Sequence, residues 1–324
     1  MLDATATSPT QVRRRARAAG ADPSGLALVL ILLIIGLSLT VPDFLSVRNI
    51  SGLALSITLI GSIAPSMTLV LALGEVDLSV ASIVAFAGVI ASLATSASNS
   101  VLVGVASGVI AGGVVGVFNG VVTAYLGVNS LITTLASMEI VRGLAYIAAH
   151  GDAVLIRQES FFRIGSSSLF GVTIPVWVML AMFLLCGVVL NLTVLGRNIL
   201  AIGGNAEAAR LAGVRVRSIR ILAFALQGVI AGLAGVILAA RLSLGDPKTS
   251  VGLELGVISA CVLGGASLTG GIATIVGVAI GVLIMGCVQD AMGLLNIPTF
   301  YQYLVRGSIL LLAVLFDRWK QARR

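Results

Sequence analysis

The sequence predicts an all-α polytopic membrane protein, because its composition, its repeated apolar runs and the position of its basic residues all indicate this class. Of the 324 residues, 58% are hydrophobic and only 10% are charged, whereas about 25% of the residues in soluble domains are charged. The formal net charge of +7 could suggest a nucleic-acid partner. However, the basic residues lie at the ends of apolar runs, where membrane topology requires them. We therefore expect a lipid bilayer around the chain and no nucleic acid.

Ten apolar runs are candidate transmembrane helices, since about 20 apolar residues cross a bilayer, although the first run is short; eight is the alternative count. The eighth and ninth runs are separated only by Gly270 and Gly271, so they could form a hairpin or broken helices. The first run lacks a convincing cleavage site and is predicted to be an uncleaved anchor. The ten runs are residues 26–41, 50–73, 78–97, 101–126, 129–149, 172–195, 219–240, 251–270, 272–290 and 301–316.

The distribution of Lys and Arg predicts the orientation. If the N-terminus is cytoplasmic, cytoplasmic segments hold thirteen basic residues: four in the N-terminal tail, five in the loop 196–220 and four in the C-terminal tail. Only five then lie outside, an asymmetry typical of membrane proteins. We therefore expect a cytoplasmic tail over residues 1–25, a transmembrane domain over 26–316 with a cytoplasmic loop at 196–220, and a cytoplasmic tail over 317–324. Eight spans would give the same orientation.

The loop 196–220, GRNILAIGGNAEAARLAGVRVRSIR, is the most informative segment. It carries five arginines, and residues 205–212 are predicted to form a short, Ala-rich helix between glycines. Small side chains allow close docking of a partner, and we interpret this helix as the contact for an ATPase subunit. The candidate contact residues are Gly204, Asn205, Glu207, Ala208, Ala209, Arg210 and Gly213.

The presence of charged residues within apolar runs requires an explanation, because inserting a charge at mid-membrane costs about 2.5–3.5 kcal/mol on insertion scales. Glu139 and Arg142 are three residues apart on one helix face and are predicted to form an intramembrane ion pair. Asp77 resembles the start of a helix, where its carboxylate would accept freed backbone N–H groups. The glycines of run 101–126 indicate tight helix packing, with a dimer face or a pathway lining as alternatives.

Several chemical signatures are missing from the sequence. It has no phosphate-binding G-x-x-x-x-G-K-[ST] motif, and a single histidine excludes a Ser-His-Asp set. The three cysteines fall inside apolar runs and are interpreted as packing residues. We expect no enzyme activity and no cofactor or metal bound by this chain. The acidic residues would permit an ion-coupled secondary transporter, although they supply no evident proton relay.

Two segments carry a resemblance to a known family. GEVDLSVASIVAFAG resembles the GG-x-DLS-x-G-S motif of the ribose- and arabinose-type sugar permeases of ABC importers, with Gly74, Asp77, Leu78 and Ser79 as the matching residues. Glu75 and Ala81 stand where the family has glycine, so the backbone geometry could differ there. GRNILAIGGNAEAARLAGVRV looks like the family's cytoplasmic coupling loop. The resemblance covers residues 40–320, and the segments 257–272 and 289–321 are similar to the arabinose type.

This resemblance implies a permease subunit of about ten helices in a bacterial inner membrane. It also implies a tandem-cassette ATPase, a periplasmic sugar-binding protein and a second permease copy as partners. L-arabinose is the cargo favoured by the resemblance, and ribose, xylose, galactose, nucleosides or branched-chain amino acids are the alternatives. A secondary transporter or channel and a membrane scaffold are the other hypotheses, although the chain has little extramembrane mass for a scaffold.

Overall fold

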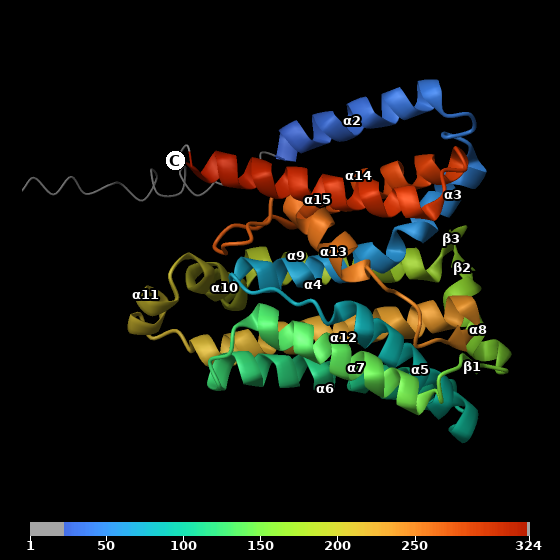
Figure 1. The fold of residues 1–324 in the computed structure, drawn as a ribbon, viewed down its shortest axis with the longest axis horizontal. Coiled ribbons are helices and arrows are strands. Elements are labelled where there is room, and N and C mark those ends of the chain that lie inside the picture. Colours follow the sequence, from blue (N-terminus) through green and yellow to red (C-terminus); the bar gives the residue numbers. More distant parts are fainter. Residues whose placement is uncertain (1–22, 323–324) are drawn as a thin grey trace, which may run out of the picture.

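The computed structural model describes residues 23–322, which form a bundle of helices that run along one long axis (Figure 1). The strands are four two-residue segments, β1 (Val154–Leu155), β2 (Ser168–Leu169), β3 (Val172–Thr173) and β4 (Leu244–Gly245). The helices are α2 (Pro23–Thr40), α3 (Val47–Ser56), α4 (Thr58–Ala72), α5 (Val80–Ser98), α6 (Val101–Tyr125), α7 (Ser130–Ala148), α8 (Glu159–Ser166), α9 (Ile174–Leu192), α10 (Val194–Gly204), α11 (Ala206–Leu211), α12 (Val216–Leu242), α13 (Leu253–Leu263), α14 (Ile275–Leu294) and α15 (Thr299–Ala322). The predicted all-helical polytopic class is confirmed.

Within residues 23–322, six helices are long and apolar enough to cross a membrane by length and composition. These are α5, α6, α7, α9, α12 and α14. The pair α3 and α4, which bends by 43° at Ile57, makes a seventh candidate, and α2, α10, α13 and α15 contribute shorter apolar helices. The four arginines predicted to hold the N-terminal tail in the cytoplasm lie outside the described residues.

The predicted span over residues 251–270 is wrong as a continuous helix. Helix α13 ends at Leu263 after 11 residues, a length of about 16 Å at 1.5 Å per residue, against a hydrocarbon core of about 30 Å. Residues 264–274 follow without helical structure until α14 begins at Ile275. Gly265, Gly270 and Gly271 have positive φ angles, which glycine adopts without a steric penalty. Of the two alternatives for this region, the structure has the broken helix.

Helices α5, α6 and α12 form the most closely packed part of the bundle, and glycines make their approach possible. A methyl group on Gly116 would lie 3.0 Å from the Cα atom of Gly228, and one on Gly112 would lie 2.7 Å from the Cα atom of Gly232. Side chains larger than hydrogen at these positions would push α6 and α12 apart. The glycines at these positions therefore serve tight packing, as the small-residue pattern predicts.

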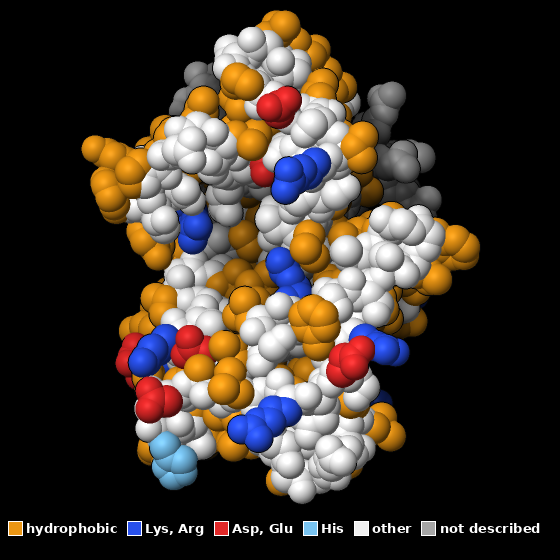
Figure 2. All heavy atoms as spheres, turned by 90° about the vertical axis from the view of Figure 1, so that its right-hand side faces the viewer, with side chains coloured by type: hydrophobic (Ala, Val, Ile, Leu, Met, Phe, Trp, Pro, Cys, Tyr) orange, Lys and Arg blue, Asp and Glu red, His pale blue; other side chains and the backbone are white. Residues whose placement is uncertain are grey.

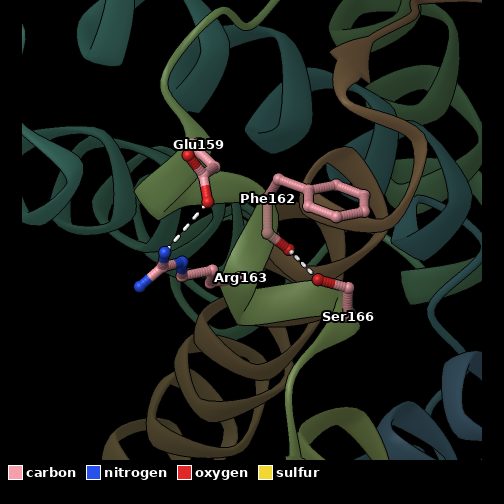
Figure 3. A network of polar contacts seen from close by, with 4 residues as sticks. All are labelled: Glu159, Phe162, Arg163 and Ser166. Atoms are coloured by element: carbon pink, nitrogen blue, oxygen red, sulfur yellow. Dashed lines mark hydrogen bonds and ion pairs between the residues drawn. The ribbon is translucent and has the colours of Figure 1, made fainter.

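The end of the bundle opposite α11 is closed by short elements between the helices. Strands β1 and β4 pair antiparallel and β2 pairs with β3. Helix α8 carries an ion pair from Arg163 Nη2 to Glu159 Oε1 at 2.9 Å and a hydrogen bond from Ser166 Oγ to the Phe162 carbonyl (Figure 3). Figure 2 shows charged side chains of both signs scattered over this end, which is typical of a surface in contact with water.

The predicted ion pair between Glu139 and Arg142 is not among the ion pairs of the described residues. Arg142 Nη1 instead donates hydrogen bonds to the carbonyl oxygens of Pro247 (2.7 Å) and Thr249 (2.8 Å). These carbonyls belong to the segment between β4 and α13, which the sequence could not place beside α7. Arg142 is half-buried, and its partners are two backbone dipoles of a distant loop rather than a carboxylate on its own helix.

Replacing Gly116 with Ala should destabilise the bundle, because the added methyl group meets the backbone of α12 rather than a movable side chain. Overpacking of this kind costs about 1–3 kcal/mol. The midpoint of thermal unfolding in detergent, followed by size-exclusion chromatography, should therefore fall. Gly143→Ala on α7 is the matched control, because a methyl group there meets nothing within 4 Å. Equal midpoints for the two variants would contradict the close-packing interpretation.

Replacing Arg142 with Gln should lower stability by about 1.5–3 kcal/mol, because a charge-assisted hydrogen bond to the 247–249 carbonyls is lost. Glu139→Gln should have little effect, and the double variant should match Arg142→Gln alone. The folded yield and the unfolding midpoint of the three variants measure this. If the double variant were more stable than either single variant, the ion pair between Glu139 and Arg142 would be the main interaction after all.

Candidate functional site

The loop predicted as a docking site folds as two short helices, α10 and α11, at one end of the bundle (Figure 1). Asn205 caps α11, since its Oδ1 atom accepts the N–H of Ala208 at 2.9 Å. At the other end, Gly213 has a φ of 85°. There the N–H of Gly213 donates to the Arg210 carbonyl and that of Val214 to the Ala209 carbonyl, both at 3.0 Å. This is a Schellman motif, so both ends of the six-residue helix are fixed.

Only one face of α11 is available to a partner. Ala209 is 6% exposed and packs into a cluster with Ile202 and Ile219, so it anchors the helix to the permease. Ala209 is one of the candidate contact residues from the sequence, and in this orientation it is buried against the bundle. Leu211, which the sequence analysis did not select, is 78% exposed. The exposed candidates are Gly204, Asn205, Glu207, Ala208, Arg210 and Gly213.

The exposed face of α11 also carries an ion pair. Arg210 Nη2 lies 2.6 Å from Glu207 Oε1, and this hydrogen bond raises the pKa of the Arg210 guanidinium. Both side chains are more than half exposed, so the pair contributes little to stability. It offers a carboxylate and a guanidinium beside the apolar Leu211. A partner would therefore meet an apolar side chain with charges of both signs at its edge.

The family motif at residues 74–79 forms a non-helical segment between α4 and α5. Gly74 has a φ of 78°. Asp77 is fully buried, and its Oδ1 atom accepts the N–H of Ser79 at 2.8 Å and the Ser79 hydroxyl at 2.6 Å. Asn119 Nδ2 donates to the same hydroxyl at 2.8 Å. The carboxylate thus accepts a free backbone N–H just before α5 begins, as predicted.

The backbone of this segment is held by side chains of α7 that sequence reasoning missed. The N–H of Val76 donates to Ser130 Oγ at 3.2 Å, and the N–H of Leu78 donates to Thr134 Oγ1 at 3.1 Å. Glu75, which stands where the family has glycine, is not among the residues with positive φ. The substitution therefore needs no unusual backbone conformation.

The segment 264–274 has a local structure similar to that of residues 73–79. Each has a glycine with positive φ, Gly74 or Gly265, two residues after the preceding helix ends. In each, a polar side chain caps the residue two positions later: the N–H of Thr269 donates to Ser267 Oγ at 3.3 Å, as the N–H of Ser79 does to Asp77. The bundle therefore contains two interrupted helix pairs of the same kind, α4–α5 and α13–α14.

The two interrupted segments meet α10 at a junction of four glycines, Gly74, Gly203, Gly270 and Gly271. A methyl group on Gly203 would overlap the Ala72 carbonyl oxygen and the Gly271 amide nitrogen, and one on Gly270 would lie 2.7 Å from the Gly74 amide nitrogen. The N–H of Gly271 also donates to the Ala72 carbonyl at 2.9 Å. We call these four residues the glycine junction. It brings three backbones into direct contact beside the docking loop.

A small cleft lies between α4 and α12, toward the end that carries β4. Arg241 Nη1 donates to Thr58 Oγ1 at 3.3 Å there, and Ser62 completes the polar part of its lining. In the described residues, no group of His, Cys, Asp and Glu could hold a metal ion. The Thr58, Ser62 and Arg241 side chains of the cleft offer hydrogen-bonding groups to a polar solute.

Comparisons of the sequence with known proteins identify its family. Residues 49–314 match the family described as branched-chain amino acid transport system / permease component. The L-arabinose ABC transporter permease protein AraH of Azospirillum brasilense is 65% identical over 89% of this chain and 85% of its own length. The L-arabinose transport system permease protein AraH of Escherichia coli K12 is 51% identical over 89% and 88%. The ribose import permease protein RbsC of the same strain is 37% identical over 88% and 90%.

No solved structure matches the chain. The family match extends over most of the sequence, and the relatives align along nearly their whole length. Such a permease is a transport subunit rather than an enzyme. The chain belongs to the permease-component family of ABC transporters, as a sugar permease of the arabinose and ribose type.

Proposed function

We propose that this chain is the membrane subunit of an ATP-driven importer that brings L-arabinose into the cell. The 65% identity with an L-arabinose permease over 89% of the chain carries this proposal. Ribose is the second candidate cargo, supported by 37% identity with ribose permeases. The difference in identity favours arabinose. Branched-chain amino acids, which the family description names, have less support than either sugar.

The proposed mechanism is alternating access. A tandem-cassette ATPase docks on α11, and its closure on binding ATP displaces the docking loop. Two permease copies then rock between outward- and inward-open states, while a periplasmic binding protein delivers the sugar. The sequence contains no phosphate-binding motif, so in an ATP-driven importer the ATP would be hydrolysed by a separate subunit. Substrate selectivity is expected to lie mainly in the binding protein, because the permease need only let the delivered sugar pass.

The proposed topology places α10 and α11 in the cytoplasm of a bacterial cell, with the protein in its inner membrane. Both termini lie on this same side, and the segments outside the transmembrane domain 26–316 are the tails 1–25 and 317–324. Support comes from five arginines in the loop 196–220 and the basic residues of both tails. The broken α13 and its extended segment together take the place of one crossing in this topology.

Replacing Leu211 with Asp should prevent the ATPase from associating, because this side chain is the most exposed apolar group of α11. Truncating a hot-spot residue of an interface lowers the binding free energy by about 2 kcal/mol or more, which is a roughly thirtyfold loss of affinity. Co-purification of the ATPase with the tagged permease measures the effect. Leu155→Asp is the matched control, since Leu155 is similarly exposed but lies in β1 at the opposite end. Undiminished co-purification of the Leu211 variant would exclude α11 as the docking site.

Uptake into proteoliposomes tests the function itself. The permease alone should not accumulate L-arabinose under a proton or sodium gradient, whereas the ATPase, ATP and the loaded binding protein together should start uptake. Accumulation by the permease alone would favour an ion-coupled secondary transporter. Uptake that requires ATP but accepts ribose, xylose or galactose in place of L-arabinose would keep the importer and reject only the cargo.

A further inference from the structure

The ion pair between Glu75 and Arg220 differs from the other two ion pairs of the described residues. The pairs Glu159–Arg163 and Glu207–Arg210 each lie within one helix and are exposed. Arg220 Nε lies 3.0 Å from Glu75 Oε1, and these side chains are only 27% and 11% exposed. The pair joins α12 to the segment 73–79, which are far apart in the sequence. Among the ion pairs of residues 23–322, it is therefore the one that joins two elements distant in the sequence.

Both ends of the docking loop contact the same short stretch of chain, from Ala72 at the end of α4 to Glu75. At the first end, Gly203 at the close of α10 lies on the Ala72 carbonyl within the glycine junction. At the second end, Arg220 in the second turn of α12 pairs with Glu75. Helix α11 lies between these two attachments. A displacement of α11 therefore reaches residues 72–75 from both sides.

The segment that receives this displacement is suited to move. Residues 73–79 lie outside the helices α4 and α5, and the segment 264–274 lies against them at Gly74 and Gly270. Non-helical backbone at membrane depth occurs where it is buried in protein or lines a cavity, and broken helices form the binding regions of many transporters. An ion pair fixes the register of such a contact more specifically than apolar packing does.

We propose that Glu75 and Arg220 are positioning residues that couple displacement of α11 by the ATPase to the two interrupted segments. Their pairing makes α12, the docking loop and residues 73–79 move together, and the glycine junction extends the motion to residues 264–274. This inference rests on the proposed function, because it assumes that an ATPase drives α11. It adds the residues through which the displacement of α11 would be transmitted to the membrane interior.

The test is the number of sugar molecules imported per ATP hydrolysed, measured in proteoliposomes with the ATPase and the loaded binding protein. Glu75→Gln and Arg220→Gln should each lower this ratio about five- to thirty-fold, the effect of roughly 1–2 kcal/mol, while ATP hydrolysis continues. Each single variant leaves a partly buried charge unpaired, so each is also expected to lower the folded yield.

The double variant Glu75→Gln/Arg220→Gln separates coupling from folding. Removing both charges leaves none unpaired, so the folded yield and the ATPase association should recover, whereas the ratio of sugar to ATP should stay low. Recovery of the ratio together with the yield would show a merely structural pair and overturn the inference. The double variant carries the test even where the single variants fail to fold.

The control is the exposed pair of α8, shown in Figure 3. Glu159→Gln/Arg163→Gln removes the same two charge types at the opposite end of the bundle, and it should leave the ratio unchanged. Absence of ATP-driven uptake by the wild-type complex would refute the proposed function and this inference with it. Coupled transport by the wild type and by the Glu75 and Arg220 variants alike would refute this inference alone.

Discussion

The need to satisfy backbone hydrogen bonds inside the membrane governs this structure. Helices meet that need internally, but the chain interrupts two helix pairs, at residues 73–79 and 264–274. The free N–H groups must then find other partners, since an unpaired group in the interior costs several kcal/mol. Ser130 and Thr134 accept two of them, and the N–H of Gly271 finds the Ala72 carbonyl. The interruptions exist only because neighbouring elements supply these partners.

Glycine serves two purposes in different parts of the bundle. Along α6 and α12, glycines bring two long helices into close contact over several turns. At the glycine junction they bring irregular segments together beside the docking loop, where few side chains separate the backbones. The permease therefore contains a tightly packed helix pair next to two interrupted ones.

The docking loop shows a similar division between attachment and recognition. Ala209 is buried against the permease and the caps at Asn205 and Gly213 fix both helix ends, so α11 is anchored to the bundle along one face. Its outer face presents Leu211 with Glu207 and Arg210 at the edge. This anchoring leaves the outer face of α11 open to a partner.

The sequence by itself determined the class, because apolar composition and basic residues at span ends follow from the bilayer and not from any particular fold. Its motifs also determined the family, and Asp77 could be assigned to a helix start from local rules. Tertiary structure decided the rest. Arg142 binds the 247–249 carbonyls instead of Glu139, Ala209 turns inward while Leu211 faces out, and α13 ends at Leu263. Each of these outcomes depends on which distant segment lies alongside, and periodicity in the sequence carries no information about that neighbour.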